Sequence, residues 1–343
     1  MSYPIAPVTH KRDPYYDILK AIAIILVVGC HTYHIKTFDL TAVNISQIIV
    51  RSICNAAVPI FLAISGYLVV QSVERYYTAN GFDYIKYIKA KTLRVYYPCL
   101  IYSAGWFILD LPNMNSYVYY LKQIITFFLC GYSVYYFVIV IMQCYILTPT
   151  LIKHPKTSLV VTCAISMITI MITSYIINVQ RIRLPLIAYA GPAYLWIIFF
   201  MLGIFFRKFG YSKSCITGGG LALIGLGLQI GEAYYIYCLN GSCRVGIKPS
   251  SFIFSIGVIM LLFSTPVRSL LLNLLNNRYI QWLGTVSFTV YLIHMYPLLI
   301  INHYIDTDSW FIEWALGISV TVGIVYILDF LIKPNKLRQL LGL

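Results

Sequence analysis

Residues 15–35 read YYDILKAIAIILVVGCHTYHI, an apolar run of membrane-spanning length that carries ionisable groups near both ends. A membrane helix needs about 20 predominantly apolar residues, because each residue advances about 1.5 Å through a hydrocarbon core about 30 Å thick. Asp17 and Lys20 stand near one end of the run, and His31 and His34 stand near the other. Ionisable side chains are costly inside a bilayer, so their presence indicates function rather than packing. We therefore expect this helix to carry the chemistry of the protein.

The composition is typical of a membrane protein with many spans. Of the 343 residues, 60% are hydrophobic and only 10% are charged, and the mean hydropathy is +0.79. A soluble domain of this length needs far more charge on its surface. The first apolar run lacks a signal-peptide cleavage site, so we expect it to remain as the first span. Hydropathy windows predict an all-α polytopic fold of about ten helices. The predicted spans are 15–35, 46–70, 95–111, 133–152, 158–178, 192–208, 214–237, 251–266, 282–303 and 310–331.

The distribution of Lys and Arg predicts the orientation. With the N-terminus in the cytoplasm, the inner segments hold basic residues about three times as often as the outer segments, as membrane proteins generally do. This predicts a cytoplasmic segment 1–14, one transmembrane domain 15–331 and a cytoplasmic tail 332–343. Attraction of the inner loops to anionic lipid heads accounts for the net charge of +14, so we expect no nucleic-acid partner.

Nine cysteines lie mostly within the predicted spans, where a thiol behaves as a small apolar group. Cys238 and Cys243 differ because they share one outer loop, CLNGSC. A disulfide is chemically reasonable on an extracytoplasmic face, and the sequence leaves open whether this pair forms one. No cysteine pair has zinc-ligand spacing and the histidines are dispersed, so no metal site is expected.

The polar groups of the first span share one face. Lys20 and His31 are eleven residues apart, which places them within about 20° of the same helix face and about 16 Å apart along the axis. Asp17 precedes Lys20 by three residues and His34 follows His31 by three, so all four lie near one stripe. A lone histidine in a membrane is often a packing residue. Its alignment with Lys20 favours His31 as a catalytic group, with Asp17 and His34 in support.

The second predicted span brings another cation into the membrane. Arg51 and Asn55 lie about two turns inside it, at a depth similar to that of His31. A buried guanidinium needs a polar cavity, a substrate anion or a neighbouring dipole. The alternative is that Arg51 reaches out to the lipid headgroups. We expect Pro59 and Gly66 to bend or thin this helix around a cavity.

The inner loop that follows, FDYIKYIKAKTLRVYYP at 82–98, interleaves Lys and Arg with Tyr and Ile. This pattern is typical of a basic amphipathic helix on the membrane surface, so lipid anchoring is one interpretation. In the other, Lys91 and Arg94 lie beneath Lys20 and bind a phosphate-bearing cytoplasmic donor through charge-assisted hydrogen bonds.

Together these stretches resemble the membrane acyltransferase 3 family over nearly the whole chain, as a single ten-span bundle. Asp17, Lys20 and His31 fill the family's Asp-x-x-Arg and Arg-x10-His patterns, and Lys91 with Arg94 fills its Arg-x-x-Arg pattern. The stretches that carry the resemblance are DILKAIAIILVVGCHT at 17–32, VPIFLAISGYL at 58–68, the Lys91 and Arg94 pair, and TVSFTVYLIHMYPLL at 285–299.

This resemblance implies transfer of an acyl group, usually acetyl from acetyl-CoA, to a hydroxyl of a cell-surface or lipid-linked glycan. It places the protein in the bacterial cytoplasmic membrane and makes His31 the catalytic base or acyl-relay group. It assigns the CoA phosphates to Lys20, Lys91 and Arg94. Lys20 and Lys91 depart from the commoner arginine, and a lysine offers a point charge instead of a bidentate fork. The extra hydrolase-like domain of some members is absent, so we expect the membrane domain itself to reach the acceptor.

The expected reaction brings the donor and the acceptor to His31 from opposite sides of the membrane. Acetyl-CoA enters from the cytoplasm along a groove beside the first helix, and neutral His31 takes the proton of a sugar hydroxyl or accepts the acetyl group itself. Arg51 or Asn55 stabilises the oxyanion. His294, in YLIHMY of the ninth span, either packs in the core or lines the substrate cavity. The sequence does not identify the acceptor, the acyl group (acetyl or succinyl) or the oligomeric state.

A multi-pass transporter or flippase is the competing class, because it also uses intramembrane His, Arg and Glu. Many transporters consist of two related halves with broken helices in matching positions, and the sequence has no such halves. A structural subunit with a degenerate site is disfavoured by His31 and its basic partners.

Overall fold

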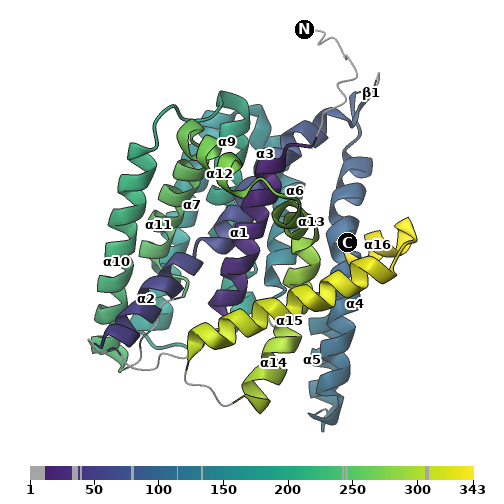
Figure 1. Cartoon of the computed structure of the whole chain (residues 1–343), viewed down its shortest axis with the longest axis vertical. Coiled ribbons are helices and arrows are strands. Elements are labelled where there is room, and N and C mark those ends of the chain that lie inside the picture. The colour runs from purple at the N-terminus through teal and green to yellow at the C-terminus, as the bar shows by residue number, and fades with distance from the viewer. Residues whose placement is uncertain are drawn as a thin grey trace.

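Helices form the architecture, as the hydropathy pattern predicts (Figure 1). The structure is a computed structural model that describes residues 12–32, 38, 41–78, 81–113, 115–132, 134–241, 243, 246–305 and 309–343. A short antiparallel hairpin, β1 (Tyr77–Thr78) with β2 (Gly81–Phe82), joins two of the helices. The helical elements are α1 (Pro14–Cys30), α2 (Ala42–Cys54), α3 (Ala57–Glu74), α4 (Tyr84–Asp110), η1 (Leu111–Asn113), α5 (Tyr117–Phe128), α6 (Tyr136–Lys153), α7 (Pro155–Ser174), η2 (Tyr175–Val179), α8 (Leu186–Ala190), α9 (Ala193–Phe209), α10 (Ile216–Asn240), α11 (Pro249–Leu262), α12 (Thr265–Leu275), α13 (Arg278–Ile293), α14 (Met295–Tyr304), α15 (Trp310–Leu331) and α16 (Asn335–Leu341).

Several helices are long and apolar enough to make this a multi-pass membrane protein. Within the described ranges, five segments meet this test, and α13 with α14 forms a sixth if the pair is one span bent by 58°. The prediction of about ten spans is not confirmed. α1 and α9 have 17 residues each and α11 has 14, so these helices are shorter than the segments that meet the test. The five segments are Asn44–Glu74, Tyr136–Lys153, Pro155–Val179, Ile216–Asn240 and Trp310–Leu331.

The second predicted span is a helix broken at Asn55, between α2 and α3. Pro59 accounts for the break, because it has no N–H to donate to the carbonyl four residues earlier. Gly66 lets α3 approach α9 closely, since a Cβ atom there would lie 2.0 Å from the carbonyl oxygen of Phe200. Both residues therefore shape this span as the sequence predicts.

The basic segment 82–98 is helical, as predicted, but it is not a separate helix. It forms the first half of α4, which continues through Pro98 to Asp110 (Figure 1). Asp83 caps the helix by accepting a hydrogen bond from the backbone N–H of Lys86 at 3.0 Å. A proline inside a membrane helix is tolerated when neighbouring groups satisfy the freed carbonyl, so Pro98 does not end α4.

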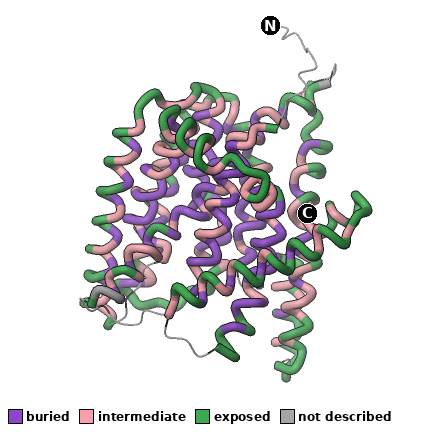
Figure 2. Tube along the Cα trace, in the orientation of Figure 1, coloured by how far each residue is buried: buried purple, intermediate pink, exposed green. Residues whose placement is uncertain are grey.

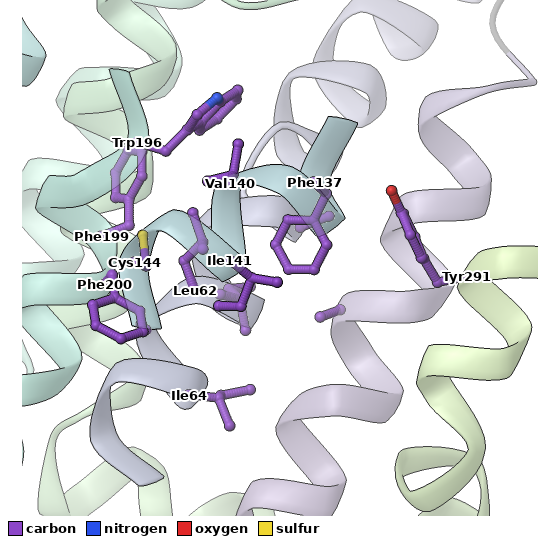
Figure 3. Close-up of a cluster of buried hydrophobic side chains, with 14 of the residues drawn as sticks. Leu62, Ile64, Phe137, Val140, Ile141, Cys144, Trp196, Phe199, Phe200 and Tyr291 are labelled. Carbon is purple, nitrogen blue, oxygen red and sulfur yellow. The ribbon is translucent and has the colours of Figure 1, made fainter. Parts of the chain in front are cut away.

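The core lies along the central helices α1, α3, α6, α9 and α13, and Figure 2 shows buried residues concentrated in the middle of the bundle. α1 packs against α13 at Gly284, where a Cβ atom would lie 2.0 Å from the carbonyl oxygen of Asp17. Buried aromatic and aliphatic side chains, Phe137 and Tyr291 among them, fill the space between these helices (Figure 3). The helix that carries His31 is thus held in the middle of the bundle.

Candidate active site

A cavity of about 250 Å³, here called the histidine cavity, lies at the C-terminal end of α1. His31 is the residue that ends α1, and its backbone N–H donates to the Val28 carbonyl at 2.9 Å. The break between α2 and α3 brings Arg51 and Asn55 to the same cavity. Three residues that the sequence singled out therefore share one space. Other lining residues are Cys30, Cys54, Tyr136, Tyr189, Trp196 and Ser251.

His294 lies beside His31, with ring centroids 5.3 Å apart. It stands at the bend between α13 and α14, where Pro297 cannot donate to the carbonyl of Ile293. Its Nδ1 is 2.6 Å from the carbonyl oxygen of Tyr291. Because a carbonyl only accepts, Nδ1 carries a proton, and in the neutral ring Nε2 keeps its lone pair. Nε2 is buried without a hydrogen-bond partner among the described residues, so His294 offers an acceptor close to His31.

A buried chain of hydrogen bonds holds Arg51. Its guanidinium donates to Asn55 Oδ1 at 2.5 Å, and Asn55 Nδ2 donates to Gln229 Oε1 of α10 at 2.7 Å. Gln229 Nε2 also donates to the Ser52 backbone carbonyl at 3.3 Å. The backbone carbonyl of Gln229 accepts from Lys248 Nζ at 2.6 Å. Gln229 and Lys248 are 0% and 1% exposed. Buried polar groups joined in this way fix one geometry, so the guanidinium is preorganised.

The sequence motifs did not indicate that Gln229 and Lys248 belong to this hydrogen-bond chain. Gln229 could have been found, because a glutamine inside the apolar, glycine-rich run GLGLQIGE is an unusual polar residue. Lys248 counted only as an outer-loop charge, and a sequence pattern gives no sign that such a lysine is buried.

A second cavity, of about 380 Å³ and here called the basic cavity, contains the other predicted cations. Lys20 of α1 and Lys91 and Arg94 of α4 all line it. Lys91 Nζ donates to Ser72 Oγ of α3 at 2.7 Å. Arg94 has no ion-pair partner in the part of the chain that the structure describes. The cavity therefore offers positive charge and hydroxyl groups, which suit a phosphate-bearing ligand.

Asp17 supports the basic cavity by pairing with Lys20. The carboxylate is 3% exposed, accepts from Lys20 Nζ at 3.2 Å, and forms a bidentate pair with Arg12 at 2.7 and 2.8 Å. Two cations thus compensate one buried carboxylate, which leaves this corner with net positive charge.

Lys91 lies before the predicted span 95–111, and its ammonium is easier to deprotonate than usual. Burial, together with the smaller effect of the nearby charges of Arg94 and Arg75, lowers the pKa of Lys91 to about 8. The charge of Lys91 therefore depends on pH close to neutrality.

The predicted tail 332–343 contributes to the basic cavity, which the sequence did not indicate. α16 packs on α4, and the Tyr102 hydroxyl donates to the Leu341 carbonyl at 3.4 Å. Gln339, Gly342 and Leu343 line the cavity.

The chain matches one family model over nearly its whole length. The model of the acyltransferase 3 family, described as an acyltransferase domain, matches residues 13–330. The chain belongs to the acyltransferase 3 family. This membership confirms the resemblance drawn from the sequence motifs and makes the protein a membrane acyltransferase. No curated protein and no solved structure matches the chain.

The sequence predicted that Lys20 and His31 share one groove of this acyltransferase. That prediction is wrong. These two residues line different cavities, and Phe137 and Tyr291 line both. Helical spacing places Lys20 and His31 on one face of α1, but it cannot reveal that side chains from α6 and α13 enter the space between them.

Two further predictions concern groups away from the cavities of the acyltransferase. His34 lies outside the described residues. Cys238 and Cys243 both carry thiols in the structure, with no disulfide between them. The described part of the chain contains no group of three His, Cys, Asp or Glu side chains that could hold a metal ion.

Proposed function

We propose that this acyltransferase moves an acetyl or other short acyl group from acyl-CoA to a hydroxyl of a cell-surface or lipid-linked glycan. The observation that carries the proposal is the pair of neighbouring cavities, one cationic and one containing His31. The proposed location is the bacterial cytoplasmic membrane, with both termini in the cytoplasm. The excess of Lys and Arg in the predicted inner segments of the sequence supports this orientation.

The residues of the basic cavity fit the phosphate end of a CoA donor. Lys20, Lys91 and Arg94 supply positive charge, and Arg94 offers the planar fork that binds phosphate in a bidentate manner. In the proposed orientation this cavity lies toward the cytoplasm, where acyl-CoA is found. The pantetheine arm would then extend toward His31.

The histidine cavity fits the transfer step. His31 takes the proton of the acceptor hydroxyl while the hydroxyl oxygen bonds to the thioester carbon. The carbon–sulfur bond then breaks, and the leaving thiolate receives the proton from His31. Arg51 stabilises the negative charge that develops on the thioester oxygen. His294 Nε2 is suited to accept an N–H of His31, which would leave the other His31 nitrogen as the base.

Turnover of purified protein in lipid nanodiscs tests the function. We expect release of free CoA from acetyl-CoA, together with a mass increase of one acetyl group on a lipid-linked glycan extract from the host membrane. Lys91→Gln should raise KM for the donor by about tenfold, because a charge-assisted contact is lost. Lys89→Gln is the matched control, since Lys89 lies on an exposed part of α4 outside the cavity. A transporter would leave acetyl-CoA unchanged, and that result would refute the proposal.

The pH dependence of donor binding provides a second prediction. The amino group of Lys91 is protonated, and so carries its charge, below its pKa of about 8. The proposed contact with phosphate is therefore present at pH 7 and is lost as pH rises through 8. A phosphate monoester has its second pKa near about 6, so the donor does not change charge in this range. KM for acetyl-CoA, measured from pH 6.5 to 9.5, should therefore rise above pH 8. In Lys91→Arg the rise should disappear, whereas an identical rise in that variant would contradict the assignment.

A further inference from the structure

Two aromatic side chains form the wall between the cavities. Phe137 of α6 and Tyr291 of α13 line both spaces, and their ring centroids are 5.5 Å apart at an interplanar angle of 68°. Figure 3 shows both side chains in the central buried cluster. These rings therefore stand where the two cavities meet, on the route that we infer for a donor thioester from the basic cavity to His31.

The two rings are held differently. The Tyr291 hydroxyl donates to the Val134 carbonyl, and the Tyr291 carbonyl accepts from His294, so this residue is tied at two points. Phe137 has no polar group on its side chain and packs edge-on against Tyr291 and beside Phe61 of α3, at a centroid distance of 6.2 Å. A ring without hydrogen bonds moves at lower cost than one that must break them. Phe137 is therefore the movable side of the wall.

We propose that Phe137 and Tyr291 form a gate that admits the acyl end of the donor to His31 and selects the acyl group by its size. This inference rests on the proposed function. A short acyl group needs only a small displacement of the Phe137 ring, whereas each further methylene needs more space in a closely packed core. The gate thus makes Phe137 a specificity-determining residue for the donor.

Donor competition tests the gate. The measured quantity is the ratio of kcat/KM for butyryl-CoA to kcat/KM for acetyl-CoA. The wild-type protein in nanodiscs gives the reference value of this ratio. We expect Phe137→Ala to raise this ratio at least about tenfold, the usual scale for one or two methylenes in an apolar pocket. Phe137→Leu should raise it less, and this variant retains enough volume to keep the core folded.

Phe206→Ala is the matched control, because Phe206 is a buried phenylalanine of α9 that lines neither cavity. Its removal leaves Phe137 and Tyr291 in place, so the ratio should stay at the wild-type value. An unchanged ratio in both Phe137 variants, or an equal rise in Phe206→Ala, would overturn the gate while leaving the proposed function intact. Failure of the wild-type protein to consume any acyl-CoA would instead overturn the proposed function, and the gate with it.

Discussion

His31→Ala is expected to lower the rate of acyl transfer by about a thousandfold or more. A positioned acid–base group typically contributes about a hundredfold to ten-thousandfold, and His31 is the only residue proposed to move the hydroxyl proton. Donor binding should not change, because His31 lies in the histidine cavity and the cations proposed to bind phosphate line the other one. Rapid-quench measurement of acetyl transfer, together with acetyl-CoA binding by calorimetry, separates the two effects.

His303→Ala controls for the loss of an imidazole. His303 lies exposed on α14, away from both cavities, so this variant should keep wild-type activity. Normal product formation by a folded His31→Ala protein would remove the basis of the mechanism. Loss of donor binding in that variant would place His31 in the donor site instead.

Arg51→Met is expected to lower kcat by about a hundredfold to a thousandfold, the range found when one oxyanion donor is removed. The methionine keeps much of the side-chain volume but removes the charged guanidinium, which a hydrogen bond to Asn55 holds in place. KM for acetyl-CoA should stay within about twofold, because the oxyanion forms only during the reaction. Arg51→Lys should restore part of the rate, since it keeps the charge but loses the rigid fork.

Gln229→Leu tests whether the buried chain positions Arg51. Gln229 does not line the histidine cavity, so its loss should lower kcat less than Arg51→Met does, without a change in donor KM. Arg183→Met, at an exposed position, is the control for removal of an arginine. A rise in KM with normal kcat in Arg51→Met would show that Arg51 binds substrate and does not stabilise the oxyanion.

The sequence predicted the helical class and the family because both depend on local features. Apolar runs, the spacing from Lys20 to His31 and the Lys91 and Arg94 pair can all be read along the chain. The gathering of His31 with Arg51 and Asn55 also followed, from equal depth in neighbouring spans. The role of each residue stays a prediction until the variants above are measured.

Other features depend on contacts between distant segments, which a single sequence does not reveal. Gln229 reaches Asn55 only because α10 packs near α2, and the ring contact between His31 and His294 requires the bend after α13. Tyr291 is one of 31 tyrosines, and nothing in its neighbours distinguishes it. The predicted number of spans is not confirmed, because hydropathy windows count apolar residues without showing where each helix ends.

Tyr291 combines tasks that Phe137 does not. Its ring lines both cavities, while its carbonyl holds the imidazole of His294 in one tautomer. In the proposed gate, a substitution of Tyr291 would disturb both donor passage and the position of His294, whereas a substitution of Phe137 would leave the His294 contact in place. A preference for bulkier acyl donors should therefore evolve more easily by substitution of Phe137 in α6 than by substitution of Tyr291 in α13. We expect descendants of this enzyme to differ first at Phe137.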